Sequence, residues 1–206
     1  MDDLLENHCS DLNTAISRLS LLSAHDALIL LKMSFSAPKM LHTLCCSPCV
    51  NHPCLEMFDN LLRKGIDTIC NLDCTDLQWH QASLLVKDGG LGVGRVSSLA
   101  FFAFIASAAA TDALQQQQLF RSSITGTTDA SVSMVRDMWS TAYATDCPTD
   151  PAATKQSTWG RVFTASERQV VISSLSDTTD KARLHAVSSP HSSDWLHALP
   201  LSGCGL

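Results

Sequence analysis

The residues of this sequence best suited to hold a metal ion are its nine cysteines. Zinc prefers four thiolate or imidazole ligands at tetrahedral geometry, usually as two close pairs separated by a longer spacer. Cys46 and Cys49 form one such pair, and Cys70 and Cys74 form a second. The spacer contains an amphipathic segment, 55–69, whose ends would have to bring both pairs together. Small buried thiols in a helical core explain the same residues without a metal, so both interpretations stay open.

A glycine-rich loop at 88–95 is the second candidate, because its backbone amides could form an anion-binding nest before a helix. Three of its glycines, Gly90, Gly92 and Gly94, lie two residues apart, which is not the spacing of the dinucleotide-binding fingerprint. The Gly-Lys-Ser/Thr ending of a phosphate-binding loop is also missing. A tight turn that directs the next helix back onto the core is therefore favoured over an anion site.

Residue types of a hydrolytic triad lie close together near the C-terminus: His191, Ser193, Asp194 and His197. Triads are recognised by geometry rather than by closeness in sequence. Ser193 is more simply interpreted as the cap of a short helix with Trp195 packed beneath it. The sequence contains neither Gly-x-Ser-x-Gly nor His-Glu-x-x-His, and its carboxylates are dispersed. It therefore predicts no self-contained catalytic constellation.

The elements that must position these residues are helices. Ser23 and Thr75 stand where helix caps are expected, and Pro38 suits the first turn of a helix. Apolar residues recur at helical spacing, which predicts helices over 24–35, 96–114, 131–143, 166–174 and 178–187. The same spacing predicts helices that start at 38, at about 53 and at 75. Gly65 could break the second of these. The stretch 115–130 reads as a flexible connection. Strand-like alternation hardly appears, so the predicted fold class is all-α.

Composition and charge exclude several classes of protein. The chain has 206 residues, is 45% hydrophobic and carries a formal net charge of −6, without the positive stripe that proteins binding nucleic acid alone usually have. Its N-terminus, Met1–Glu6, is acidic and unlike a secretory signal. The longest apolar stretch, Leu99–Ala110, is shorter than the roughly 20 residues of a membrane helix. We therefore expect no membrane span, an intracellular location in cytoplasm or nucleus, and reduced thiols.

The order of several segments resembles the region just after the palm in reverse transcriptases of non-LTR retrotransposons. In the first half these segments are Ser20–Leu28, Ala37–His42, Cys46–Cys49, His52–Pro53, Phe58–Arg63, Gln78–Leu84 and Lys87–Gly92. In the second half they are Lys181–Leu184, Pro190–His191 and Asp194–Pro200. The resemblance covers nearly the whole chain except about 115–155. Leu85 and Gly94 depart from it, since the family usually has Pro and Arg there.

The resemblance implies that segments 20–70 correspond to the thumb, a helical unit that packs against the primer–template duplex. The parent polymerase holds two magnesium ions with paired aspartates of its palm. This sequence has no Asp-Asp pair outside Asp2–Asp3, so the implied function is a catalytically incompetent fragment of an RNA-directed DNA polymerase. The implied partners are an RNA–DNA or DNA duplex, bound weakly, and the missing palm domain. Duplex phosphates would contact Lys32, Lys39, Arg63, Lys64, Lys87 and Arg95.

The domain organisation expected from both arguments has four parts: a helical lead-in at 1–19, a thumb-like region at 20–114, a flexible or partly ordered connection at 115–157, and a truncated C-terminal helical segment at 158–206. Two alternatives to the polymerase fragment belong to other classes of protein. One is a helical protein-interaction module, stabilised by zinc if the four cysteines converge. The other is an autonomous enzyme that uses His191 and His197.

Overall fold

The computed structural model describes residues 1–121, 129–149, 152–196 and 198, and this part of the chain consists of helices and turns without a strand. The prediction of an all-α fold is confirmed. The chain divides into two compact units. Unit 1 comprises Met1–Lys39, Pro53–Val96 and Ser166–Leu206, and unit 2 comprises Met40–His52 and Ser97–Ala165. Each unit is thus assembled from segments that lie far apart in the sequence.

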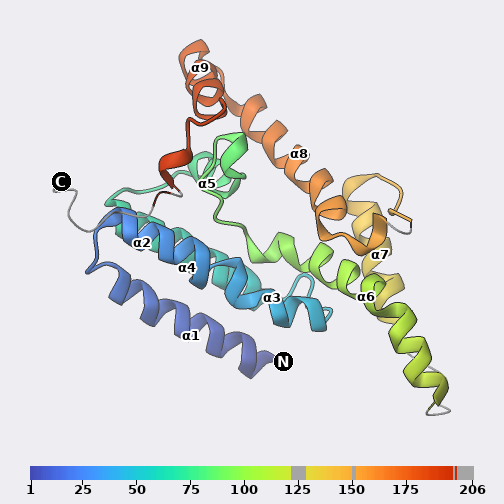
Figure 1. The fold of residues 1–206 in the computed structure, drawn as a ribbon. Coiled ribbons are helices and arrows are strands. Elements are labelled where there is room, and N and C mark those ends of the chain that lie inside the picture. Colours follow the sequence, from blue (N-terminus) through green and yellow to red (C-terminus); the bar gives the residue numbers. More distant parts are fainter. Residues whose placement is uncertain (122–128, 150–151, 197, 199–206) are drawn as a thin grey trace. The chain divides into compact units, whose positions relative to one another are not determined.

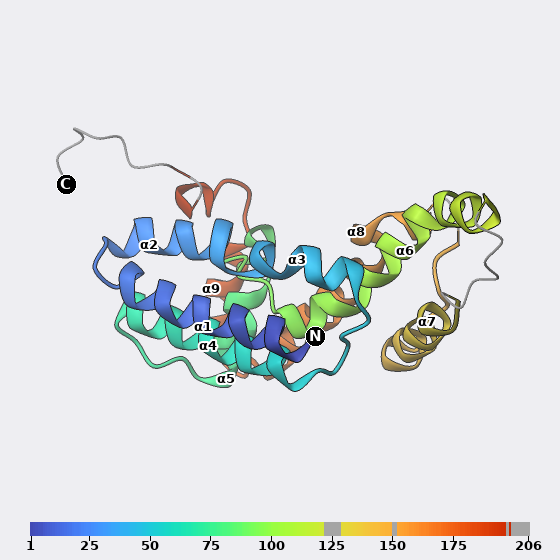
Figure 2. The same ribbon diagram turned by 90° about the horizontal axis from the view of Figure 1, so that it is seen from below.

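Three helices form the centre of unit 1. Both α1 (Asp2–Leu19) and α2 (Ala24–Leu30) pack against α4 (Pro53–Cys70), as the blue and teal ribbons of Figures 1 and 2 show. α1 and α4 each bury one apolar stripe at helical spacing, as expected of amphipathic helices. The stripe of α1 is Leu5, Cys9, Leu12, Ala15, Ile16 and Leu19, and the apolar part of that of α4 is Cys54, Leu55, Phe58, Leu62, Gly65 and Ile66.

Gly65 does not break α4, although the sequence allowed a break there. The helix continues through Gly65 to Cys70. A Cβ atom at this position would lie 3.1 Å from two carbon atoms of the Ile16 side chain. The Ile16 side chain of α1 therefore fills the space that a side chain at position 65 would need. This close packing offsets the low helix propensity of glycine.

The helix predicted over 24–35 changes geometry in its last part. Ser23 caps α2 as predicted, because its hydroxyl accepts a hydrogen bond from the Asp26 amide (3.3 Å). The chain then continues as η1 (Leu31–Phe35), a π-helical turn in which the Ser36 amide donates to the Leu31 carbonyl (2.9 Å). The following helix, α3 (Ala37–Cys46), carries Pro38 in its first turn, also as predicted.

α5 (Asp76–Ser83) begins with the cap that Thr75 predicts. The Thr75 hydroxyl accepts a hydrogen bond from the Gln78 amide, and the Gln78 side chain accepts one from the Thr75 amide (2.9 Å). This reciprocal pair fixes where the helix starts. A short 3-10 turn, η2 (Val86–Asp88), then leads into the glycine loop.

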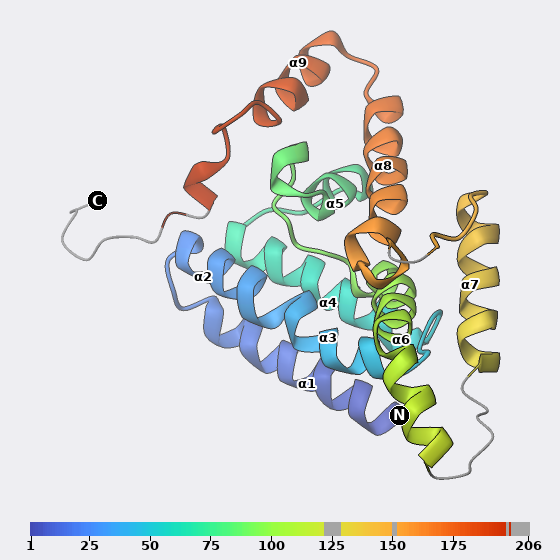
Figure 3. The same ribbon diagram turned by 45° about the vertical axis from the view of Figure 1, so that its right-hand side comes forward.

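The C-terminal helix of unit 1, α9 (Thr178–Val187), spans the predicted range and is capped by Asp177. Its Leu184 packs with Leu84 and Val171 in a small apolar cluster. Figure 3 shows α9, α5 and the adjoining end of α8, the elements around this cluster. Residues after 166 are therefore needed to cover Leu84, which lies about 80 residues earlier in the chain.

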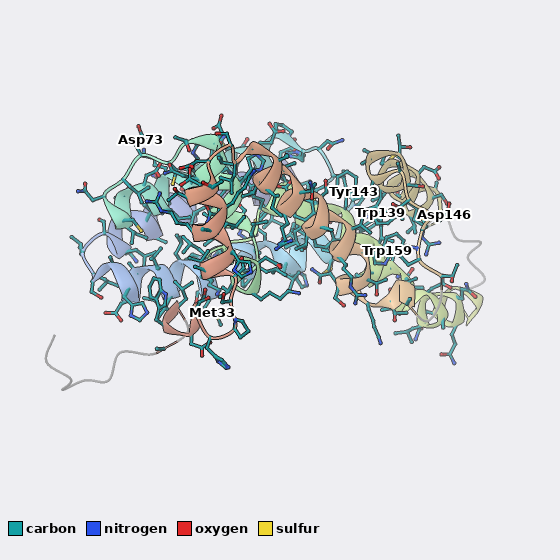
Figure 4. The ribbon with its side chains drawn as sticks, turned by 90° about the horizontal axis from the view of Figure 1, so that it is seen from above. Met33, Asp73, Trp139, Tyr143, Asp146 and Trp159 are labelled. Carbon is teal, nitrogen blue, oxygen red and sulfur yellow. The ribbon has the colours of Figure 1, made fainter. Side chains whose placement is uncertain are left out.

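Unit 2 is held together by aromatic side chains of α6 (Val96–Arg121), α7 (Asp129–Tyr143) and α8 (Gln156–Ser174). The indole rings of Trp139 and Trp159 meet edge to face with their centroids 4.9 Å apart. Tyr143 lies beside Trp139, as the labelled side chains of Figure 4 show, and it also meets Phe163. Aromatic pairs of this kind stabilise a core beyond their buried area.

Two predicted helix boundaries in this region are wrong. α6 extends through residues 115–121, which we expected to be flexible, because Gln115 and Gln116 donate to Thr111 and Asp112 one turn earlier (2.7 and 2.8 Å). α8 starts at Gln156 instead of at the capping-box sequence 166–169. Trp159 is fully buried and donates to the Ala153 carbonyl (2.7 Å), which stabilises the first turns of α8.

One helical stretch among the described residues, Val96–Gln118, is long and apolar enough to cross a membrane by length and composition alone. This stretch was not predicted, because its longest unbroken apolar run is short. A core helix of a globular protein has the same composition. Within its most apolar 18 residues 44% are buried in the protein, and Phe102, Phe104 and Ile105 are among the buried residues of the helix. The stretch is therefore weak evidence for a membrane protein.

Candidate functional site

The glycine loop is a tight turn whose amides are already bonded. Four consecutive amides donate to backbone carbonyls: Gly89 to Val86 (3.1 Å), Gly90 to Leu85 (3.2 Å), Leu91 to Ala82 (3.0 Å) and Gly92 to Leu84 (2.9 Å). Gly89 and Gly92 have φ of 87° and 72°, which side chains disfavour. The favoured prediction of a turn is confirmed. These four amides cannot form the anion-binding nest that was its alternative, because the backbone has already used them.

The N-terminus of α6, which follows the loop, is also bonded to a side chain of the protein itself. The Asp59 carboxylate of α4 accepts a hydrogen bond from the Val96 amide (2.7 Å), and Asp59 is only 6% exposed. A helix N-terminus favours a negative charge, and here a side chain of unit 1 supplies it. Asp59 was not among the predicted site residues. Its signal was an acidic residue placed among Leu55, Phe58 and Leu62 on an apolar helix face.

Arg95, predicted to contact phosphates, instead belongs to a largely buried cluster. Its guanidinium pairs with Glu167, and both side chains are 16% exposed. The same Glu167 oxygen lies 2.8 Å from Nδ1 of His80, and Asp88 lies near Arg168 (3.9 Å). This cluster joins α5, the glycine loop and the part of α8 from Ser166 onward, all of which belong to unit 1. No local sequence pattern indicates this role of Glu167, because its partners come from distant segments.

Lys32 is also unavailable to a duplex. Its Nζ atom is buried and has no hydrogen-bond partner among the described residues. A Cβ atom added to Gly92 would lie 3.1 Å from this Nζ, so the ammonium lies against the glycine loop. Burial lowers the pKa of Lys32. In this conformation the Lys32 ammonium is therefore covered by the protein itself.

The remaining four predicted cations differ in whether an ion pair holds them. Lys39 pairs with Asp11 (3.0 Å), and Arg63 pairs with Asp76 (2.7 Å) while also donating to the Cys74 carbonyl. Lys64 and Lys87 are exposed, and no ion pair of theirs occurs in the described part of the chain. Two of the six predicted cations thus remain free on the surface, and a third, Lys39, is held only by a half-exposed ion pair.

The four predicted zinc ligands are divided between the units. Cys46 and Cys49 belong to unit 2, whereas Cys70 and Cys74 belong to unit 1. Within the described residues no group of three or more His, Cys, Asp or Glu side chains could hold a metal ion. Burial raises the pKa of Cys49, Cys70 and Cys74, the last to about 11, so these thiols carry protons at neutral pH.

A hollow of about 370 Å³ brings two of the predicted features together in unit 1. Cys70 and Cys74 line it together with Gly89 and Gly90 of the glycine loop. The rest of its wall is mainly apolar and includes Leu28, Ile66, Leu72, Ala82, Leu91 and Trp195. The cysteines therefore serve as wall residues of an apolar hollow.

The residues near His191 do not form a triad in the part of the chain that the structure describes. His191 is exposed and its Nδ1 lies 2.9 Å from Asp194. The Ser193 hydroxyl donates to the Val187 carbonyl (3.2 Å), and Ser193 directly precedes the short turn η4 (Asp194–Leu196), the position of a cap. Trp195 is 55% exposed, so the expectation that it packs beneath this turn is wrong. His197 lies outside the described residues.

Unit 2 contains a further concave surface that the sequence did not indicate. An open groove of about 930 Å³ runs along one face of α7. Its described lining is Asn51, Phe101, Ala130, Ser133, Met134, Asp137, Met138, Thr141 and Ala142. Most of the lining is apolar, and Met134 is 53% exposed. The sequence pattern of α7 alone could not distinguish this face from the buried face of Val135 and Trp139, because both carry apolar residues.

Comparisons with known proteins assign no family. No protein-family model, curated protein or solved structure matches this chain.

Proposed function

We propose that this chain is a catalytically incompetent piece of a non-LTR retrotransposon reverse transcriptase, composed of thumb and post-thumb helices, that binds a duplex backbone weakly. The ordered set of segments that resembles this family supports the assignment, as does the all-helical fold, which is the fold a thumb requires. The proposed location is intracellular, in cytoplasm or nucleus, where such a polymerase would act.

The observation that carries the binding function is the exposure of Lys64 and Lys87 in unit 1. Lys39 joins them, because a half-exposed ion pair such as Lys39–Asp11 contributes at most about 1 kcal/mol and a phosphate can replace the carboxylate. Arg95 and Lys32 do not take part, since one is paired and the other buried. Three phosphate contacts on a protein of net charge −6 give weak, strongly salt-dependent binding.

The parent palm is the second partner in this proposal. Unit 1 leaves large apolar side chains in solvent, among them Leu21 at 84% exposure, Met33 at 60% and Trp195 at 55%. A polymerase thumb packs on its neighbouring domain, so such side chains are the expected remainder of that interface.

Duplex binding is tested by fluorescence anisotropy with a labelled RNA–DNA hybrid. We expect micromolar binding that weakens roughly 40-fold between about 50 and 200 mM salt, because three contacts give a slope near −2.7 in log affinity against log salt. Replacing Lys39, Lys64 and Lys87 by Ala should abolish it.

The matched control replaces three exposed cations outside the proposed interface, Lys155, Arg161 and Lys181, by Ala. Both triple variants change the net charge equally, so only a local interface separates them. Equal losses in the two variants, or no binding by the folded wild-type chain, would refute duplex binding.

A further inference from the structure

We propose that the groove along α7 in unit 2 binds an amphipathic helix of a partner protein that presents an apolar face with a lysine or arginine at its middle. This inference is independent of duplex binding, which we assigned to unit 1. It rests on the shape of the groove, on the residues that α7 turns towards it and on the position of a single charge.

The groove has the dimensions of a helix-binding surface. Ala130, Met134, Met138 and Ala142 recur every four residues along α7, so they form one continuous strip. At 1.5 Å rise per residue the strip is about 18 Å long, which matches about three turns of a partner helix. The neighbouring side of α7 is already buried through Val135 and Trp139. The strip is therefore a face that the described residues of unit 2 leave uncovered.

The side chains of the strip suit a helical partner. Its two ends carry alanine, which lets a partner backbone approach closely, and its middle carries methionine, whose flexible thioether adapts to apolar side chains. Phe101 of α6 adds an aromatic wall. Amphipathic helices bind grooves of this kind through apolar residues three or four positions apart.

Charge determines which helix fits. Asp137 is exposed and is the one charged residue among the described residues that line the groove. A partner with a cation opposite Asp137 gains an ion pair within an apolar surface, whereas an acidic partner is repelled. The net charge of −6 also accelerates encounter with a basic partner.

A second copy of this chain is a poor occupant. Asp137 lies almost at the middle of the strip between Ala130 and Ala142. A symmetric pairing of two α7 helices about the middle of the strip would bring Asp137 of both copies together. Two like charges within an apolar interface disfavour that dimer.

The test uses the full chain and a fluorescent amphipathic peptide of about 18 residues, made of leucine, alanine and lysine with one lysine within its apolar face. We expect saturable binding with Kd on the order of 10 µM and about tenfold weaker binding when glutamate replaces the lysines. Met134→Gln should weaken binding about fivefold, and Asp137→Lys about tenfold.

Matched controls come from unit 1. Met33→Gln and Asp73→Lys alter an equally exposed methionine and an exposed aspartate, both labelled in Figure 4, and should change Kd less than twofold. Circular dichroism checks that each variant is folded, which is expected since all four residues are on the surface. A peptide of the same composition in scrambled order, which forms no apolar face, is the peptide control. The proposal fails if this scrambled peptide binds equally well, if the glutamate peptide binds as tightly, or if the unit 1 variants weaken binding as much as the groove variants.

Discussion

Asp59 shows how one residue can replace a ligand. Its carboxylate is buried on α4 and accepts the hydrogen bond of the Val96 amide that begins α6. The start of α6, which was predicted as a candidate anion site, is thereby bonded to a carboxylate of the protein itself. The carboxylate is a constituent of unit 1, so its loss should be measured as a loss of stability.

Asp59→Ala should lower the free energy of unfolding by about 2 to 3 kcal/mol, because a buried amide loses a charged acceptor. Asp59→Asn, which keeps an acceptor oxygen, should lose less. Urea denaturation followed by circular dichroism gives both values. Asp76→Ala is the control, since that carboxylate is almost fully exposed and its pair with Arg63 contributes less than about 1 kcal/mol. Equal losses at Asp59 and Asp76 would contradict the assigned role.

At the scale of elements, the turn that carries the glycine loop depends on Gly90. A Cβ atom there would lie 2.2 Å from the Leu84 carbonyl oxygen and 2.5 Å from that of Gln81. Backbone atoms cannot move aside as a side chain can. The connection between α5 and α6 therefore requires glycine at this position.

Gly90→Ala should destabilise the protein by on the order of 3 kcal/mol, because the backbone of the turn must shift. Gly94→Ala is the matched control: its added Cβ would meet only the Ala37 side chain, at 3.8 Å, so the change should stay within about 0.5 kcal/mol. Thermal unfolding of both variants tests the difference. Similar melting temperatures would show that the turn relaxes.

Helices could be predicted from the sequence where the signal is local. Ser23 and Thr75 marked helix starts correctly because a cap is a contact within one turn. The capping-box sequence at 166–169 predicted the wrong start for α8. The helix begins earlier, at Gln156, because the burial of Trp159 stabilises its first turns, which is a tertiary effect. The surroundings of Arg95 and Lys32 could not be predicted for the same reason, since the partner of Arg95 and the burial of the Lys32 ammonium depend on distant segments.

At the scale of the whole molecule, neither unit is a continuous stretch of sequence. The thumb-like region predicted at 20–114 contains parts of both. Unit 1 needs Val171 and Leu184 to cover Leu84, and Glu167 to pair with Arg95. The predicted thumb-like region therefore does not coincide with either compact unit.

A fragment of residues 1–114 should lack a cooperative unfolding transition and should bind a hydrophobic dye such as ANS, since the cover of Leu84 is missing. A chain ending at residue 196 should melt in the manner of the full protein. Thermal melts followed by circular dichroism, with dye fluorescence, distinguish the two. A sharp transition of the shorter fragment at the temperature of the full chain would argue that Ser166–Leu206 contributes nothing to unit 1.

The divided composition of unit 1 has a consequence for synthesis in the cell. Residues up to Val96 emerge from the ribosome first, but the segment that completes their unit starts at Ser166, about 70 residues later. At about 5 to 20 residues per second, the nascent chain waits roughly 4 to 14 s with Leu84 uncovered. During that interval the emerging chain is a target for chaperones and proteases, so the amount of protein in a cell depends on translation speed as well as on stability.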